Sequence, residues 1–177
     1  MRLYKPGQKF FVIDYETTGL DYEKSQPIEV GIIVCDHEFN AIETYSSLIE
    51  PDEPDDPDDW SWLEAYRVHG IKPEDLESAP PPAEVTVDIS QLASRHNRRE
   101  MKPVLVSDNI QFEWHWTARL FRQQTFAWPF HYCGWDSSLL LEATGVGDPK
   151  PAHRALADAG LLHAAIVKAL DRVRSLR

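Results

Sequence analysis

The stretch Phe10-Phe11-Val12-Ile13-Asp14-Tyr15-Glu16-Thr17-Thr18-Gly19-Leu20 decides the fold expected for this chain. Four apolar residues lead into two acids separated by one aromatic residue, and Thr-Thr-Gly then ends the pattern. This pattern is typical of a buried β-strand that ends in a turn. Because side chains alternate between the two faces of a strand, Asp14 and Glu16 are predicted to point in the same direction.

Two carboxylates side by side at the end of an apolar strand have two interpretations. Like charges left unpaired there are costly, so the pair favours a bound cation, most simply a hard divalent metal ion held through oxygen. The alternative is a strand end whose two acids merely face water. The spacing alone does not choose between these interpretations.

Length and charge set the limits of the expected fold. The 177 residues fit one domain, 1–177, with enough material for a sizeable core. The net charge is -11, but the segment 51–59 alone carries six acids and three prolines, and without those six charges the net charge is -5. This acidic segment is predicted to be a solvated loop, with partner binding as the alternative. The overall charge therefore does not exclude a polyanionic substrate.

Cysteine usage and hydropathy indicate the compartment. Cys35 and Cys133 lie in apolar surroundings without ligand-type spacing, so both are expected to be core thiols in a reducing environment. No apolar run approaches the length that spans a membrane, and residues 1–8 lack the apolar core of a signal peptide. We therefore expect a cytoplasmic protein without a membrane partner.

Hydrophobic patterning predicts a mixed α/β sheet. Short turns join the first strand to strands over 26–36 and 42–49, which favours antiparallel hairpins. A strand over 103–107 leads directly into a helix, and 131–136 can form a last strand. Further helices are predicted over 72–76, from 83 to 99 and from 152 to the end.

Two other segments each allow two interpretations. The apolar residues Trp60, Trp62, Leu63, Tyr66 and Val68 can stack on bases, or they can anchor the chain after the acidic segment. The basic cluster over 95–99 can contact phosphate, or it can be the solvated end of a helix.

The scattered acids combine into a catalytic hypothesis. Asp14 and Glu16 come from the first strand, one acid comes from the region 108–113, and Asp158 comes from the last helix. Four carboxylates around a cleft suit two metal ions ~3.5 to 4 Å apart, which serve in-line phosphoryl displacement. His153 lies at the loop that enters the last helix, and an unperturbed histidine pKa near ~6.5 suits a general base that takes a proton from water.

The motifs resemble those of the DnaQ-like DEDDh 3'-5' exonucleases of the RNase H-like superfamily. Residues 11–20 look like the first motif of that family, 106–113 like its second and 153–159 like its third. Between them, Ile28-Glu29-Val30-Gly31 is similar to its second strand and Val68-His69-Gly70-Ile71 to its His-Gly-Ile segment. The resemblance spans nearly the whole chain.

The resemblance implies an RNase H-like five-stranded sheet, with three antiparallel strands followed by parallel strands and flanking helices. It also implies two Mg²⁺ or Mn²⁺ ions held by Asp14, Glu16, Glu113 and Asp158, with His153 as general base. The second motif departs from the family pattern, because Ser107-Asp108 replaces the usual Gly-His and glutamate replaces aspartate at position 113. Asp108 or Asn109 is expected to cap the following helix. Asp108 is the rival for the fourth acid, although as the expected cap it would be occupied with backbone amides.

The implied substrate is a single-stranded 3' end, released stepwise as nucleoside 5'-monophosphates. The family resemblance places the last nucleotides against apolar residues near the first motif, for which Tyr15 and Leu20 are the nearest candidates. Thr17 and Asn109 are further candidates for substrate binding. His69 is another, with a turn histidine that caps a helix end as the alternative.

Three functions stay open from the sequence. The leading one is a 3'-5' exonuclease on DNA, and the second is a 3'-5' exoribonuclease of the RNase T or oligoribonuclease kind. The third, from another class, is a non-catalytic module that binds nucleic acid or a polymerase. Whether the chain also forms a homodimer or joins a polymerase is left undecided.

Overall fold

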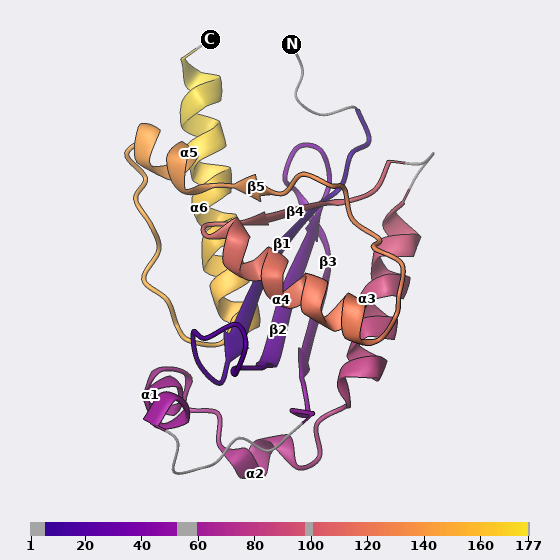
Figure 1. The fold of residues 1–177 in the computed structure, drawn as a ribbon. Helices are drawn as coiled ribbons and strands as arrows, with labels where there is room; N and C mark the ends of the chain where they lie inside the picture. The colour runs from indigo at the N-terminus through magenta and orange to yellow at the C-terminus, as the bar shows by residue number, and fades with distance from the viewer. Residues whose placement is uncertain (1–5, 53–59, 98–100, 177) are drawn as a thin grey trace.

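A five-stranded mixed sheet forms the centre of the computed structural model, which describes residues 6–52, 60–97 and 101–176 (Figure 1). The strand order is β3-β2-β1-β4-β5. The first three strands are antiparallel neighbours, and the last two run parallel to β1. The strands are β1 (Phe10–Thr17), β2 (Pro27–Cys35), β3 (Ala41–Leu48), β4 (Val104–Ser107) and β5 (Trp135–Asp136). The predicted RNase H-like sheet is therefore confirmed.

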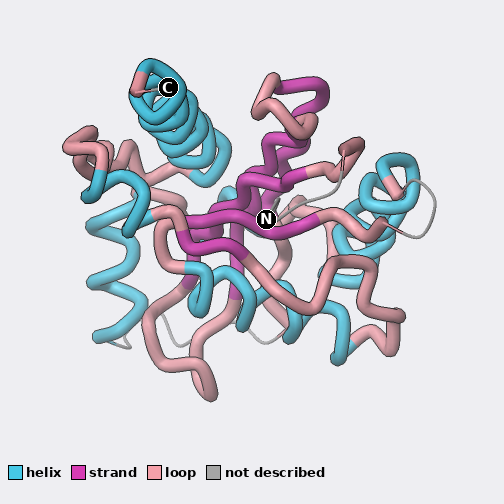
Figure 2. The backbone as a smooth tube through the Cα atoms, turned by 90° about the horizontal axis from the view of Figure 1, so that it is seen from above, coloured by secondary structure: helices cyan, strands magenta, loops and turns pink. Residues whose placement is uncertain are grey.

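Helices cover both faces of the sheet, and they form two separate cores. One core joins β1 and β2 to α3 and α4, and the other joins β1, β2 and β4 to α5 and α6. Figure 2 shows α6, which carries the C-terminal end, on one side of the sheet and other helical segments on the opposite side. The helices are α1 (Trp60–His69), α2 (Pro73–Leu76), α3 (Pro82–His96), α4 (Ile110–Gln123), α5 (Ser138–Ala143) and α6 (Ala155–Ser175).

Alternation along β1 explains where the acids point. Phe10 and Val12 belong to the core under α6, whereas Phe11 and Ile13 belong to the core under α3 and α4. Continuing the same alternation places Asp14 on the α6 side of the sheet, two residues beyond Val12. The sheet face that packs against α6 thus changes from apolar to acidic near the beginning of that helix.

Gly31 on β2 lets α6 approach the sheet closely. A Cβ atom at this position would lie 2.2 Å from the backbone nitrogen of Leu156 and 2.3 Å from the carbonyl carbon of Ala155. Gly31 pairs with Asp14 across the β1–β2 ladder. The first turn of α6 therefore lies against the sheet beside Asp14, and only glycine leaves room for it.

Several elements differ from the sequence prediction. Helix α1 replaces a segment for which no helix was expected, and α5 was not predicted. Within α1, Val68 is exposed and Leu63 is at the border of exposure, while Ile71 and Leu76 form the small core with Ile28. The hydrophobic anchor after the acidic segment is thus provided by the residues that follow α1. The side chains of Trp60 and Trp62 lie outside the described part.

Element ends also shifted because tertiary contacts decide them. Strand β5 covers two residues instead of six, since it pairs only at Trp135 and Asp136 with the end of β4. Helix α6 begins at Ala155 instead of residue 152. His153 therefore lies in the loop before α6.

The predictions for the cysteines and for the charged segments have different outcomes. Cys35 is buried as predicted, but Cys133 is exposed, so the prediction of two core thiols was wrong for Cys133. The acidic residues 53–59 and the two arginines at 98 and 99 lie outside the described residues. Within the described ranges, no helix combines the length and the apolar character that crossing a membrane requires.

Candidate active site

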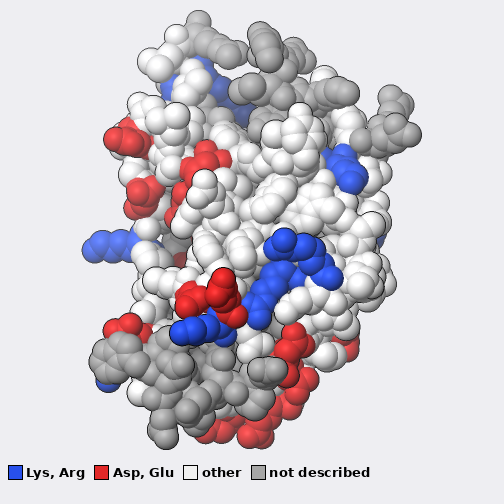
Figure 3. Space-filling model, in the orientation of Figure 1, with Lys and Arg blue, Asp and Glu red and all other residues white. Residues whose placement is uncertain are grey.

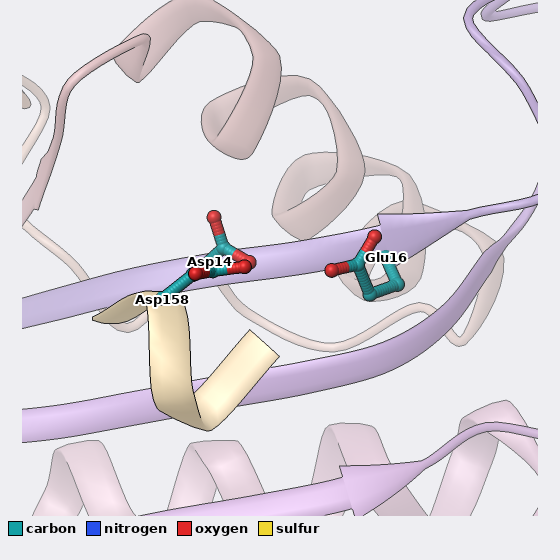
Figure 4. A group of neighbouring side chains, drawn as sticks. All are labelled: Asp14, Glu16 and Asp158. Atoms are coloured by element: carbon teal, nitrogen blue, oxygen red, sulfur yellow. The ribbon is translucent and has the colours of Figure 1, made fainter. Parts of the chain in front are cut away.

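Three carboxylates converge where β1 passes the first turn of α6. Asp14, Glu16 and Asp158 each place one carboxylate oxygen so that the three atoms lie within 4.8 Å of one another. Figure 4 shows the first two side chains extending from the same strand and Asp158 reaching Asp14 from the helix. The predicted cluster of acids from residues 144 positions apart in the chain therefore forms in three dimensions.

Burial and mutual repulsion disfavour the charged forms of these acids. Burial is the main cause that raises the pKa of Asp14 to about 9, and the charges of Glu16 and Asp158 raise it further. Burial also raises the pKa of Glu16 to about 7, with Asp158 and Glu29 adding to the effect and Arg154 opposing it. A site that concentrates negative charge in this way binds cations strongly, because a cation removes the repulsion.

The loop before α6 is closed onto Asp158. Its carboxylate oxygens accept the backbone N–H groups of Ala152 at 2.5 Å and Arg154 at 3.2 Å. Between these two residues, His153 adopts a left-handed backbone with φ of 58°, which few non-glycine residues do. Such strained conformations occur where surrounding contacts enforce them, and here the two bonds to Asp158 hold both neighbours of His153.

His153 shares a cleft with the acids. This acid cleft, of about 270 Å³, is lined by Asp14, Glu16, Asp108, His153 and Asp158 together with neighbouring apolar residues. The structure therefore brings the histidine and three of the four acids assigned by the sequence resemblance around one space.

Glu113, the predicted fourth acid, approaches from the other face of the sheet. It lies in the first turn of α4, is only 3% exposed, and its Oε2 atom has no hydrogen-bond partner among the described residues. Burial first, and then the charge of Asp14, hold the pKa of Glu113 well above its usual value. The charge of Asp14 therefore acts on Glu113, but Glu113 is not part of the three-acid cluster.

A gap in the sheet makes this approach possible. The pairing of β1 with β4 runs from Phe10 to Val12 only, because β4 ends at Ser107. Beyond that point, β1 has no pairing partner on its β4 edge among the described residues. Asp108 is exposed and lines the acid cleft.

Of the two residues expected to cap α4, Asn109 lies at the N-cap position and Asp108 does not. The helix α4 has Asn109 at its N-cap position without a side-chain cap bond. The backbone N–H of Ile110 donates instead to Asp136, at 3.3 Å, and that of Asn109 donates to the hydroxyl of Ser107, at 3.2 Å. Because β5 lies beside β4, an acid from a distant strand takes the place that the local sequence suggested for Asp108.

A second cleft adjoins the acid cleft at Glu16. This Leu20 cleft, of about 730 Å³, lies between the turn after β1, the outer side of α1 and the start of α4. Its walls include Leu20, Val68 and Phe112, and Leu20 is 81% exposed at its rim. An apolar cleft next to clustered acids has the composition that a nucleotide base beside a phosphate-processing centre requires.

Four of the five predicted substrate-binding residues border this cleft. These are Tyr15, Thr17, Leu20 and His69, whereas Asn109 lines neither cleft. The Tyr15 ring is 4% exposed and belongs to the core under α4, so it does not offer a stacking surface as was expected. The Thr17 hydroxyl donates to the carbonyl of Gly19 at 2.8 Å and thereby fixes the turn that carries Leu20.

His69 combines both of its predicted interpretations. Its Nδ1 atom accepts the backbone N–H of Ile71 at 3.0 Å, as a turn histidine does at the end of α1. The same residue also lines the Leu20 cleft. Burial lowers its pKa, which favours the neutral ring.

The donor set fits hard divalent cations. Carboxylate oxygens are the ligands that Mg²⁺ and Mn²⁺ prefer. The buried Oε2 atom of Glu113, without a partner among the described residues, is an acceptor that a cation beside Asp14 would satisfy. The three-acid cluster and Glu113 are therefore suited to hold metal.

The acidic charge is unevenly distributed over the surface. Figure 3 shows Asp and Glu side chains toward one edge and the bottom of the face, and Lys and Arg side chains at its centre over α4. Arg119 and Arg122 belong to this helix. A chain with a net charge of -11 therefore still presents basic side chains on the face drawn in Figure 3.

The comparisons with known proteins agree with this geometry. The RNase T family model, described as exonuclease, matches residues 11–165. Exonuclease I of E. coli in complex with a dT13 oligonucleotide is similar in structure, with a TM-score of 0.73 and 20% sequence identity. That match covers 96% of this chain and 42% of the other.

Two further structures show the same likeness. A zinc-bound form of the E. coli exonuclease I complex with single-stranded DNA has a TM-score of 0.70 and 20% identity, covering 95% of this chain and 43% of that one. Exonuclease I from Methylocaldum szegediense has a TM-score of 0.73 and 23% identity, covering 93% and 41%. No curated protein sequence matches.

The chain thus spans less than half the length of the exonuclease I chains that it resembles. At these identities the structural likeness shows the fold, and the family model shows the family. The chain belongs to the RNase T exonuclease family, the DnaQ-like 3'-5' exonucleases.

Proposed function

We propose that this chain removes nucleotides from single-stranded 3' ends of DNA by a two-metal mechanism. The observation that carries the proposal is the convergence of Asp14, Glu16 and Asp158 in one cleft with His153. Asp14, Glu16, Glu113 and Asp158 would hold two Mg²⁺ or Mn²⁺ ions. Bound ions of this kind supply Lewis acidity that stabilises negative charge on the phosphoryl oxygens.

The residues of the chain contribute orientation and proton transfer. His153, in the mouth of the acid cleft, takes a proton from the attacking water. The water oxygen bonds to the phosphorus of the terminal nucleotide, and the bond from phosphorus to the O3' of the preceding nucleotide breaks. The leaving O3' takes up a proton from solvent. The products are a nucleoside 5'-monophosphate and a strand with a new 3'-hydroxyl group.

The Leu20 cleft would bind the terminal nucleotide. Leu20, Val68 and Phe112 offer apolar contact to the base, and Glu16 marks the boundary with the acid cleft where the scissile phosphate would lie. A single-stranded end suits the site better than a duplex interior, because the acidic chain offers little to grip a phosphate backbone along its length. The preference for DNA is supported by the likeness to exonuclease I, whose structures hold DNA oligonucleotides.

The testing experiment compares 5'-labelled single-stranded DNA and RNA of identical sequence, with Mg²⁺ or Mn²⁺ and with EDTA. We expect stepwise shortening from the 3' end of DNA, faster than that of RNA, which EDTA abolishes and which Asp14→Ala reduces at least a thousandfold. Faster digestion of RNA would instead support an exoribonuclease. A folded protein that cleaves neither strand with any metal would contradict the proposal and favour a binding module.

A further inference from the structure

Glu29 is a buried acid next to the site that the proposed mechanism does not use. It lies on β2 directly across from Glu16 in the antiparallel ladder and is 4% exposed. A carboxylate in such a place must be fully hydrogen-bonded to be tolerated. The hydrogen-bond partners of Glu29 therefore identify the segment that it holds against β2.

Among the described residues, the hydrogen bonds to the Glu29 carboxylate come from Arg154, the residue before α6, and from Ala155, the first residue of α6. Arg154 donates from Nε to both carboxylate oxygens at 3.1 Å and from Nη2 to Oε1 at 2.6 Å. The backbone N–H of Ala155 donates to Oε2 at 2.9 Å. Arg154 is the N-cap residue of α6 and makes no side-chain cap bond of its own, so Glu29 serves as the cap from a distant strand.

The segment held in this way carries both catalytic groups of the third motif. His153 directly precedes Arg154, and Asp158 accepts the backbone N–H of Arg154 at 3.2 Å. Two residues beyond Glu29, Gly31 removes the side chain that would push the Ala155–Leu156 backbone away. Strand β2 thus both attracts the beginning of α6 and makes room for it, beside the strand that carries Asp14 and Glu16.

We propose that Glu29 is a positioning residue, which through Arg154 and Ala155 fixes His153 and Asp158 relative to Asp14 and Glu16. The inference rests on the proposed function, because it assigns Glu29 to the same metal site. Without the carboxylate, the N–H of Ala155 and the guanidinium lose their partner, and the loop that holds His153 in its left-handed conformation is free to relax. Groups that orient metal ligands in this way typically change affinity or activity by about 10- to 100-fold.

The test uses Glu29→Gln, Arg154→Gln and the double variant, with Glu43→Gln as the matched control. Glu43 forms the other carboxylate pair that joins a strand of the same sheet to a later helix, with Arg95 at 2.7 Å and His96 at 2.6 Å. It lines neither cleft. Two quantities are measured: kcat and KM on single-stranded DNA, and the Mn²⁺ dissociation constant by calorimetry without substrate.

We expect Glu29→Gln to lower kcat by about 10- to 100-fold with KM changed less than threefold, and to weaken Mn²⁺ binding by about tenfold. Arg154→Gln removes contacts from the exposed side of the pair and guards against a Glu29 variant that fails to fold. Its effects should be of the same sign, and those of the double variant should be less than additive. Glu43→Gln should leave both quantities within twofold of the wild type.

Two outcomes would overturn the proposal. One is a folded Glu29→Gln protein with unchanged kcat and Mn²⁺ affinity, even if its melting temperature is lower, because the pair would then only stabilise the fold. The other is equal losses in the Glu43→Gln control. If the wild type cleaves nothing, the proposed function fails, and Mn²⁺ binding by the variants still decides the positioning role.

Discussion

At the scale of single residues, the acids reach the site from both faces of the sheet. Asp14 and Glu16 lie on the side of α6, whereas Glu113 comes from α4 on the other side and is buried. Because β4 stops pairing with β1 at Val12, Glu113 can approach Asp14 beyond the end of β4. The larger glutamate at position 113 is consistent with this route, since its extra methylene group lengthens its reach.

Substitution of Glu113 and Asp108 identifies the fourth ligand. We expect Glu113→Gln to lower kcat at least a hundredfold and to weaken Mn²⁺ binding, because it removes a charge beside Asp14. Asp108→Asn should lower kcat less than fivefold, because Asp108 lines the cleft wall but is exposed. The measurement is kcat with a Mn²⁺ titration by calorimetry. The reverse order of effects would make Asp108 the ligand.

Leu20 tests the nucleotide site without disturbing the core. Leu20→Ala should raise KM for single-stranded DNA about three- to tenfold and leave kcat within twofold, because an exposed apolar contact that adds only to binding does not change the chemical step. Leu139→Ala is the control, since Leu139 is also largely exposed, at 73%, but lies on α5 and lines neither cleft. Equal changes in both variants, or an unchanged KM for Leu20→Ala, would contradict the site.

At the scale of elements, the close packing of α6 against β2 decides the geometry of the site. The first turn of α6 approaches the β2 backbone at Gly31, and the helix buries a stripe of small and branched residues against the sheet. Ala159, Leu162 and Ile166 belong to that stripe. A shift of this helix would move Asp158 away from Asp14.

Two glycine substitutions separate this packing effect from helix propensity. Gly31→Ala should lower the free energy of unfolding by about 2 to 4 kcal/mol and reduce kcat, because its Cβ would overlap the Leu156 backbone. Gly160→Ala should raise it by about 0.5 to 1 kcal/mol, because its Cβ would meet only Ile33 Cδ1 at 3.8 Å and alanine favours helix. Urea denaturation measures both. A Gly31→Ala protein as stable as the wild type would contradict the close packing of α6 against β2 at Gly31.

At the scale of the whole molecule, the buried acids of the site make the stability of the metal-free protein depend on pH. Burial and the neighbouring carboxylates raise the pKa of Asp14 to about 9 in the folded chain, compared with 3.8 for the free group. The folded state therefore keeps a proton that the unfolded state has already released. The free energy of unfolding must then fall as pH rises toward 9.

We expect the metal-free protein in EDTA to lose about 2 kcal/mol of stability between pH 7 and pH 8.5, at about 1.4 kcal/mol per pH unit. His69 and His115, whose pKa values are lowered mainly by burial, titrate below this window. Saturating Mn²⁺ should reverse the trend, since it binds the deprotonated acids. Urea denaturation at each pH measures this, and Asp14→Asn should flatten the slope. A free energy of unfolding that stays constant or rises with pH in EDTA would contradict the raised pKa of Asp14.

The sequence by itself predicted the sheet and most of the residues that the structure brings together at the acid cleft. Period-two alternation in β1 predicted that Asp14 and Glu16 share a face, and the helix predicted from residue 152 onward carries Asp158. These predictions held because they depend on local geometry, which repeats along the chain. The position of His153 before the last helix, together with histidine chemistry, also predicted its place in the acid cleft.

Only the tertiary structure decided what depends on contacts between distant segments. The sequence showed Glu29 as an acid within an apolar strand, but not that Arg154 and Ala155 bind it. Local capping rules assigned Asp108 to the start of α4, where Asp136 from β5 serves instead. Burial of Tyr15 and exposure of Cys133 likewise follow from which elements pack above them. Pattern fixes the direction of a side chain, whereas only the packing of other elements sets its partners and its exposure.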